Sequence, residues 1–341
     1  MSIKKQGKYT FQMECQNPFV ITMHHLDHFP KGNGKSGPLD KIPVSNSEEF
    51  DLDAPWRMYY GKEVPGFPAH PHRGFETVTI VTQGVVDHTD GLGASGRYAN
   101  GDVQWMTAGK GLQHCEMFPL IHEDKPNTME LFQIWLSLAG KQRMDPPDYK
   151  MLWREDIPVI KKNNEKGAES RITLIAGEVD GIHAVPPTSS SWAANPENHL
   201  SIQLIELDPK GNVTIPSVSK TLNRSLYLYE GSGVSLENIT LGNKEYVFLS
   251  GDEDVKLENV GDKVVKLLLL EAEPIPEKIL AYGPFVMSSE EEIRQAYIDY
   301  QATQFGGWPF ETEEVYHKPD QVRYAKYADG RIETPEANSA D

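Results

Sequence analysis

The chain has 341 residues, of which 38% are hydrophobic and 24% are charged, and its formal net charge is −17 at pH 7. This length predicts two domains, each with its own apolar core. The negative charge disfavours direct binding to nucleic acid or to anionic membranes, because phosphate contacts need a basic surface. No run of about 18 apolar residues is present, which predicts that no segment spans a membrane.

The N-terminal stretch MSIKKQGKYTFQMECQNPFV contains no continuous apolar segment of the kind found in secretory signals. Cys15 and Cys115 are the two cysteines, and one pair at this distance does not predict a disulfide framework. We therefore expect a cytoplasmic protein.

Residues 31–61 begin with GNGKSGP, which is flexible by composition, and continue with the acidic SEEFDLD. The segment ends just before Gly66 and His70. It is either a gate over the site described next, or a passive surface loop or dimer contact. The sequence leaves these alternatives open.

Two short clusters carry side chains that bind metals. HPHRGFET places His70 and His72 two residues apart, and GLQHCEM does the same for His114 and Glu116. Alternate residues of a strand share a face, with Cα atoms roughly 6.6 Å apart. Two neighbouring strands can therefore present three imidazoles and one carboxylate to a single ion. This donor set has no thiolate and suits iron, manganese, nickel, copper or catalytic zinc. The alternative is a chance spacing of solvated histidines.

Short β-branched and aromatic runs dominate the rest of the chain, separated by Gly, Asn, Asp and Pro. They cover residues 77–82, 129–138, 200–207, 222–229 and 264–270. This pattern predicts a β-sandwich or barrel. The irregular residues 155–170 indicate a boundary between two halves.

The second half repeats the frame of the first without its histidines. When the halves are aligned on their turn glycines, Ser217, Ser219, Lys256 and Glu258 fall at the positions of the four candidate ligands. We therefore expect no metal in the second half.

Residues 288–301 read as a helix. Ser288 or Ser289 precedes a group of glutamates, which is a capping-box pattern. Ile293, Tyr297 and Tyr300 share one face, and Gly306–Gly307 is expected to end the helix.

Three segments together resemble the pirin family of the cupin superfamily: GFPAHPHRGFETVTIVTQG, GDVQWMTAGKGLQHCEM and YGPFVMSSEEEI. The chain is most similar in plan to the longer bacterial pirin-like proteins. The resemblance implies an all-β bicupin, with two jelly-roll β-barrels packed together and a C-terminal helix and extension. The implied division is residues 1–150 for the barrel with the metal site, 165–285 for the barrel without ligands, and 286–341 for the helix and extension.

The resemblance also implies the metal ligands, namely His70, His72, His114 and Glu116. It departs from the general cupin pattern, in which the carboxylate ligand would be Glu76. Glu76 stays a candidate for a place beside the ligands, with a buried structural carboxylate as the alternative. Four residues are candidates for an apolar wall or for core packing: Phe67, Phe75, Trp105 and Met106.

Pirins are associated with quercetin 2,3-dioxygenase activity, so the resemblance implies a dioxygenase that opens a flavonol-like chelating substrate. Fe(II) is the expected cofactor, with Mn, Ni, Cu and Zn as alternatives, and Glu116 is the expected proton acceptor. The alternative function is an iron-dependent redox-sensing regulator that acts through a protein partner. A third interpretation is a barrel stabilised by a fully ligated metal.

Overall fold

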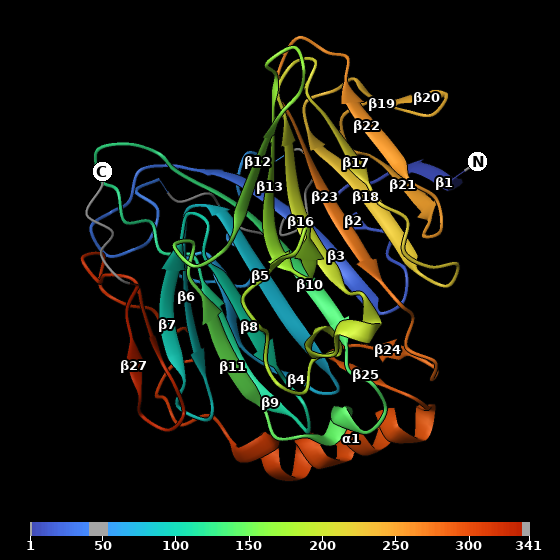
Figure 1. Ribbon diagram of the computed structural model, residues 1–341. Helices are drawn as coiled ribbons and strands as arrows, with labels where there is room; N and C mark the ends of the chain where they lie inside the picture. Colours follow the sequence, from blue (N-terminus) through green and yellow to red (C-terminus); the bar gives the residue numbers. More distant parts are fainter. Residues whose placement is uncertain (1, 41–53, 336–341) are drawn as a thin grey trace. The chain divides into compact units, whose positions relative to one another are not determined.

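The computed structural model describes residues 2–40 and 54–335, which divide into two compact units (Figure 1). Unit 1 comprises Met1–Ile21 and Asp156–Pro276, and unit 2 comprises Thr22–Glu155 and Glu277–Asp341. The predicted all-β class is confirmed, because the described elements are β-strands apart from one α-helix and four short 3-10 turns. No helix in the described ranges is long and apolar enough to cross a membrane.

Unit 1 contains a large sheet and a small one. The larger has seven strands in the order β1-β21-β18-β23-β16-β13-β12. Their bounds are Ile3–Lys8, Glu245–Ser250, Asn223–Glu230, Val265–Ala272, Ser201–Leu207, Glu169–Ala176 and Val159–Asn163. The smaller has the order β17-β22-β19-β20, with bounds Asn212–Ile215, Val255–Asn259, Val234–Leu236 and Ile239–Leu241. A hairpin of β14 (Glu178–Val179) and β15 (Ile182–His183) adjoins them in sequence.

The core of unit 1 is aliphatic and draws on both sheets. Ile172 and Leu226 come from the larger sheet, and Val213 and Leu257 come from the smaller one. The cluster consists of Leu, Ile and Val side chains alone. Burying such branched side chains between two sheets is the main source of stability for a barrel of this kind.

Unit 2 also has two sheets. One runs in the order β11-β8-β5-β10-β3, with bounds Asp148–Leu152, Val103–Thr107, Phe75–Gln83, Asn127–Ser137 and Phe19–Phe29. Strand β3 begins in unit 1 and continues into unit 2. The short β2, Gln12–Met13, precedes it. The other sheet runs β27-β26-β7-β6-β9-β4, with bounds Ile332–Glu333, Tyr324–Lys326, Ser95–Ala99, Val85–Asp90, Leu112–Met117 and Gly66–His72.

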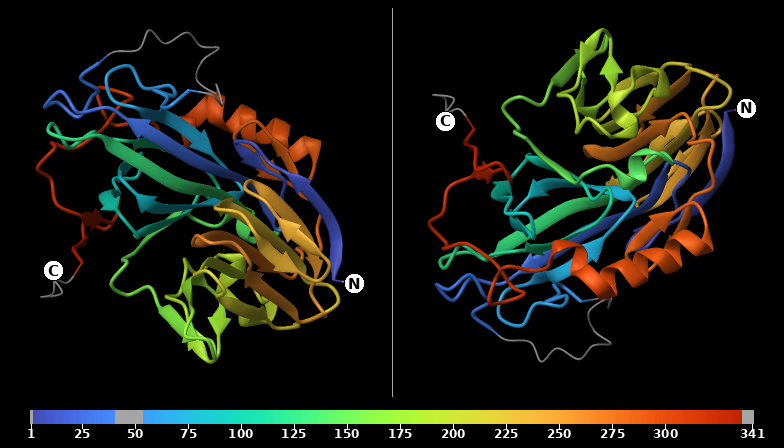
Figure 2. Two further views of the ribbon diagram at one scale, coloured as in Figure 1. Left: turned by 90° about the horizontal axis from the view of Figure 1, so that it is seen from above. Right: turned by 90° about the horizontal axis from the view of Figure 1, so that it is seen from below.

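Helix α1, Glu290–Thr303, is the orange-red coil of Figure 1 and Figure 2 and follows the hairpin β24 (Leu280–Tyr282) and β25 (Phe285–Met287). Ser289 caps it by accepting a hydrogen bond from the Glu292 amide at 3.2 Å, which confirms the predicted start. The predicted apolar face packs on Phe285 and Met287. The predicted end is wrong, because the helix ends at Thr303 and Gln304 takes the left-handed conformation in place of a glycine.

The termini go to different units from those expected. The sequence predicted 1–150, 165–285 and 286–341, whereas residues 1–21 belong with 156–276, and residues 277–341 belong with the first barrel. β1 pairs with β21, more than 230 residues away along the chain (Lys5 opposite Phe248), so no local pattern could reveal it.

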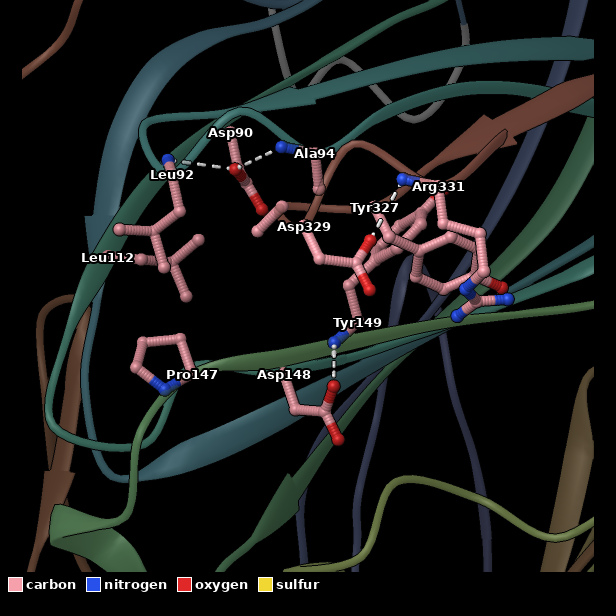
Figure 3. A pocket seen from close by; sticks show the side chains of 11 residues that line it. Asp90, Leu92, Ala94, Leu112, Pro147, Asp148, Tyr149, Tyr327, Asp329 and Arg331 are labelled. Carbon is pink, nitrogen blue, oxygen red and sulfur yellow. Dashed lines mark hydrogen bonds between the residues drawn. The ribbon is translucent and has the colours of Figure 1, made fainter. Parts of the chain in front are cut away.

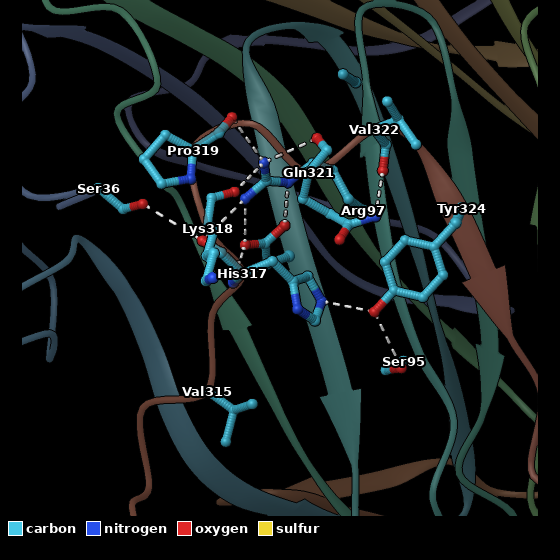
Figure 4. Close-up of polar contacts among 12 residues, drawn as sticks. Ser36, Ser95, Arg97, Val315, His317, Lys318, Pro319, Gln321, Val322 and Tyr324 are labelled. Carbon is cyan, nitrogen blue, oxygen red and sulfur yellow. Dashed lines mark hydrogen bonds and ion pairs between the residues drawn. The ribbon is translucent and has the colours of Figure 1, made fainter. Parts of the chain in front are cut away.

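Several polar contacts hold the C-terminal extension, among them Arg323 with Asp102 and Trp153 with Glu333, and a buried arginine makes several more. Arg97 pairs with Asp87 through Nε at 2.7 Å and Nη2 at 2.8 Å. Its guanidinium also donates to the backbone carbonyls of four extension residues, shown in Figure 4: His317, Lys318, Pro319 and Gln321. Strand β26 then pairs with β7 and covers what would otherwise be a sheet edge.

Residues 31–61 are described in part. The stretch from Gly32 to Pro38, whose composition predicted flexibility, is a hydrogen-bonded turn in which Asn33 accepts from the amides of Lys35 and Gly37. Residues 41–53, which include the acidic part, lie outside the described residues. The prediction of a gate falls on this part of the segment.

Candidate metal centre

The two predicted ligand pairs lie on neighbouring antiparallel strands, as their spacing indicated. Strand β4 carries His70 and His72, strand β9 carries His114 and Glu116, and His70 stands directly opposite His114. A bulge between Phe67 and His70 shifts the register of β4. Such bulges re-aim side chains at functional sites.

The three imidazoles form a compact group. One ring nitrogen from each of His70, His72 and His114 can be chosen so that all three lie within 4.8 Å of one another. The ring centroids are 4.5 Å apart for His70–His114, 4.7 Å for His70–His72 and 4.9 Å for His72–His114. Burial lowers the pKa of each of these histidines, so the rings are held neutral, the form that binds metals.

The hydrogen bonds of these rings leave metal-binding atoms unpaired. His70 Nδ1 lies 2.8 Å from the Pro68 carbonyl oxygen, which can only accept, so Nδ1 carries the proton and Nε2 keeps its lone pair. Within the described part of the chain, His72 Nδ1 and both nitrogens of His114 are buried without a hydrogen-bond partner. Buried polar atoms without partners are rare and costly. A metal ion would pair with one nitrogen of each ring, so the residues present fit one.

Glu116 lines a cavity together with His70 and His72, and few hydrogen-bond donors face its carboxylate. Thr79 Oγ1 is 3.0 Å from Glu116 Oε1 but only 2.7 Å from Gln133 Oε1, and Tyr98 OH is 3.4 Å from Glu116 Oε1 but 2.6 Å from Gln104 Oε1. Each hydroxyl has one proton, and the shorter distances assign both protons to the amide oxygens. This leaves Gln133 Nε2, 3.2 Å from Oε2, as the firm donor.

Burial therefore dominates the electrostatics of this carboxylate and raises the pKa of Glu116. A carboxylate that is 5% exposed and accepts one firm hydrogen bond is expensive to ionise without a nearby cation. Glu116 is not part of the compact group of three histidines, although it lines the same cavity as His70 and His72.

The cavity beside the histidines has a volume of about 80 Å³. It is lined by aromatic and apolar side chains with a few polar ones: Met23, His25, Phe67, His70, His72, Thr79, Glu116, Phe118, Leu131, Gln133 and Trp135. Of the four predicted wall candidates, Phe67 lines it. Phe75, Trp105 and Met106 do not, and all three are buried in the core.

Glu76 is a buried carboxylate that is bonded to neighbouring side chains, and it does not line the cavity beside the histidines. It accepts hydrogen bonds from Trp105 Nε1 at 3.0 Å and Thr107 Oγ1 at 2.7 Å. It lies three residues from Thr79 on β5, so it occupies the opposite strand face from this cavity-lining residue. On one unbroken strand, Glu76 would share a face with His70 and His72, because all three positions are even-numbered. The chain instead turns at Gly74, with φ +86°, between β4 and β5.

Sequence reasoning missed His88 and His25. The His88 ring lies 5.4 Å from that of His114 and stacks on Tyr149 at 5.1 Å. His88 and Asp90, and likewise His25 and Asp27, stand two residues apart as His114 and Glu116 do, so the same spacing rule could have selected both histidines. Cross-strand pairing brings His88 opposite Glu116.

A second cavity of about 270 Å³ lies between β6, β11 and the extension (Figure 3). Its polar lining includes Asp90, Asp148, Asp329 and Arg331, and Tyr149 and Tyr327 form part of its aromatic wall. The two tyrosine rings meet edge to face at 5.6 Å.

The serines that the sequence alignment matched to His70 and His72 do not lie on the strand opposite Lys256, because β17 ends at Ile215 and pairs Thr214 with Lys256. Lys256 and Glu258 are exposed and form an ion pair at 3.6 Å, and Ser219 hydrogen-bonds to Glu273. No group of metal-binding side chains occurs in the part of unit 1 that the structure describes.

Comparisons with known proteins agree with this geometry. The Pirin family model matches residues 45–136, and the model for the Pirin C-terminal cupin domain matches residues 203–306. A pirin-like protein of Solanum lycopersicum is 36% identical over 274 residues, which is 79% of this chain and 87% of that protein. The chain belongs to the pirin family.

Two further relatives carry a named activity. A Pseudomonas aeruginosa protein that is provisionally named a quercetin 2,3-dioxygenase is 37% identical over 246 residues, covering 70% of this pirin and 79% of that protein. The crystal structure of quercetin 2,3-dioxygenase from Acinetobacter baumannii superposes with a TM-score of 0.70 at 26% identity, covering 90% of this chain and 98% of the other. These likenesses confirm the predicted bicupin fold.

Proposed function

We propose that this pirin is a metal-dependent dioxygenase resembling quercetin 2,3-dioxygenase, with His70, His72, His114 and Glu116 as ligands of one divalent transition metal. The observation that carries the proposal is the group of three neutral imidazoles, of which His72 and His114 are buried with unpaired nitrogens, beside a carboxylate with one firm hydrogen-bond donor. Fe(II) is our proposed ion, and Mn, Ni, Cu and Zn have compatible donor preferences.

When bound, such an ion would act as a Lewis acid toward a chelating enolate, and it would provide a route for electron density to dioxygen. The chain's own residues bind and orient the substrate around that ion. Phe67, Phe118 and Trp135 supply the apolar wall that excludes water from the flavonol rings.

Glu116 is the proposed proton acceptor for the flavonol hydroxyl. Its Oε1 has no firm donor, as the hydroxyl distances around it show. The raised pKa of Glu116 brings this carboxylate closer to the range in which a general base is efficient at neutral pH. Gln133 holds the other oxygen and keeps the carboxylate aligned.

The cavity sets a condition on this function. Sites for drug-sized ligands typically measure about 300–1,000 Å³, whereas this cavity measures about 80 Å³. A flavonol therefore needs its aromatic wall to move. Phe67 is half-buried and contacts Tyr60, which is 51% exposed, so the rim near these rings is the part that can open.

The test combines metal analysis with dioxygen uptake on a flavonol panel, using protein purified without added metal or chelator. We expect Glu116→Gln to keep much of the metal, since an amide oxygen can ligate, and to lose turnover by about 10²-fold or more. Glu76→Gln is the matched control, because it changes the same group outside the cavity. Wild-type turnover in Glu116→Gln would refute the base assignment.

The narrow cavity also favours a second candidate, a redox-sensing regulator that acts through a protein partner and needs no room for substrate. Three results together would support this candidate: the purified chain binds iron, it takes up no dioxygen with any flavonol, and its affinity for a protein partner differs between the Fe(II) and Fe(III) forms. A small-molecule substrate that opens the cavity would exclude it.

A further inference from the structure

The second cavity, between β6, β11 and the C-terminal extension, is separate from the candidate metal centre. Its volume is about 270 Å³, and none of its lining residues also lines the cavity beside the histidines. Sites for drug-sized ligands typically begin at about 300 Å³, so this cavity suits a smaller molecule. Much of its lining is apolar or aromatic: Leu92, Ala94, Leu112, Pro147, Tyr149, Tyr327 and Ala328.

One buried carboxylate in this cavity has an oxygen without a donor. Asp90 is 3% exposed, and its Oδ1 accepts hydrogen bonds from the amides of Leu92 and Ala94, both at 2.9 Å. Oδ2 accepts none from the described residues, because His88 Nε2 is 3.8 Å away, beyond hydrogen-bond distance. Figure 3 shows Oδ2 turned away from the two amides, toward the space that the lining side chains surround. A buried carboxylate oxygen without a donor is costly, so Oδ2 is suited to accept from a ligand.

The charges around the cavity select a cation. Its lining includes the carboxylates of Asp90, Asp148 and Asp329, and one guanidinium, that of Arg331. The Arg331 side chain is already engaged, because Nη1 lies 3.1 Å from Glu333 Oε2 and the guanidinium carbon lies 3.6 Å from the centroid of the Tyr327 ring. The lining therefore keeps an excess of negative charge, which favours a positively charged ligand.

The arrangement suits an organic cation better than a metal ion. Among the described residues, the compact group of metal-binding side chains is that of His70, His72 and His114, and the three carboxylates of this cavity do not form another. A single ion could not contact all three carboxylates at once. The apolar and aromatic lining instead offers a surface on which the hydrocarbon part of an amine can be buried.

We propose that this cavity binds a small primary amine in its ammonium form. The ammonium group donates a hydrogen bond to Asp90 Oδ2, and the hydrocarbon part packs against Leu112, Pro147 and the Tyr149 ring. A charge-assisted hydrogen bond of this kind is among the stronger polar contacts in proteins. The site goes beyond the proposed dioxygenase function and does not depend on it.

Two matched probes test the assignment on the full-length chain. 4-Fluorobenzylammonium and 4-fluorobenzyl alcohol share a ring and a linker, and they differ in the charged group. Fluorine NMR titrations at pH 7 measure both Kd values on protein freed of metal, so that the amine cannot coordinate an ion. We expect the ammonium probe to bind about tenfold or more tightly than the alcohol, which is the effect of a hydrogen bond between charged groups.

Three variants locate the bound probe. Asp90→Asn removes the charge and keeps an acceptor oxygen for the two backbone amides, so it should weaken ammonium binding about tenfold or more while the alcohol changes little. Asp320→Asn is the matched control, because it makes the same change at an exposed extension residue outside the cavity. Ala328→Trp fills the cavity from an exposed position and should abolish binding of both probes. The midpoint of urea unfolding confirms that each variant is folded.

A fourth variant excludes the candidate metal centre as the binding site. His70→Ala, His114→Ala should leave the Kd of the ammonium probe unchanged, and loss of binding there would place the probe at the histidines and overturn the proposal. No binding of the ammonium probe, equal Kd values for the two probes, or an unchanged Kd in Asp90→Asn would also overturn it. If Asp90→Asn does not fold, Ala328→Trp decides, because unchanged ammonium binding in that variant excludes the cavity.

Discussion

The two barrels of this pirin both bury apolar side chains, and they differ in the polar groups that they bury beside them. The core of unit 1 is a cluster of Leu, Ile and Val, including Leu226 and Leu267, with no group of metal-binding side chains among its described residues. The interior of unit 2 buries histidines, glutamates and glutamines, several of them with unpaired atoms. Apolar burial stabilises a barrel, whereas unpaired polar atoms destabilise it. The unpaired nitrogens of the candidate metal centre therefore cost unit 2 stability in the absence of an ion.

The largest expected effect is on metal content. We expect the double variant His70→Ala, His114→Ala to reduce bound metal from one ion per chain to none, because it removes two of three clustered imidazoles. The control is Ser219→Ala, Lys256→Ala, at two unit 1 positions that the sequence alignment matched to candidate ligands. Elemental analysis measures both, and a second ion per chain or retention of metal in the histidine variant would break the comparison.

The next effect is on stability and belongs to the aliphatic core. Leu226 is fully buried in the unit 1 cluster, so Leu226→Ala should cost about 2–5 kcal/mol of unfolding free energy. Metal content should stay unchanged. Urea unfolding and metal analysis on the same preparation check this, and loss of metal at full stability would contradict the division of roles.

The pH dependence of the unfolding free energy gives a further test of the polar interior of unit 2, at His25. In the unfolded chain His25 binds a proton below about 6.5, whereas the native residue resists protonation until its pKa of about 3. Its lowered native pKa contributes stability above pH 6.5 that is lost as the pH falls toward 3. Metal-free His25→Phe should therefore lose less stability between pH 7 and pH 4, by up to about 3 kcal/mol. If wild type and His25→Phe lost equal amounts of unfolding free energy between pH 7 and pH 4, the result would show that native His25 is readily protonated.

The smallest effect concerns Glu116 in metal-free protein. Because burial raises the native pKa of Glu116, its stabilising contribution is present at low pH and is lost as the pH rises through that value. Near neutral pH, Glu116→Gln should then raise the stability by about 1 kcal/mol, or Tm by roughly 2–4 °C. Glu76→Gln, which weakens the acceptor of Trp105 and Thr107, should lower it. Calorimetry of the two variants measures these changes in Tm. If both variants lost the same amount of stability, Glu116 would be a structural residue.

Short-range spacing selected the four residues of the candidate metal centre. His70, His72, His114 and Glu116 could be paired from sequence because each pair lies within one continuous strand, where alternation is strict. The same rule misled for Glu76, since Gly74 breaks the strand between it and His72. Phe75, Trp105 and Met106 share the apolar character of Phe67, and only packing could decide which residue faces the cavity.

The sequence by itself determined the all-β class, the candidate ligand pairs, the lack of histidines at the aligned positions of the second half and the start of the helix. These depend on residues close together in the chain, whose relative directions are set by strand or helix geometry. The tertiary structure alone decided that residues 1–21 join unit 1, that Arg97 holds the extension, and that Tyr59 and His25 meet beside the ligands. Each of these outcomes depends on contacts between distant segments, and no local periodicity encodes which distant partner a strand or side chain will meet.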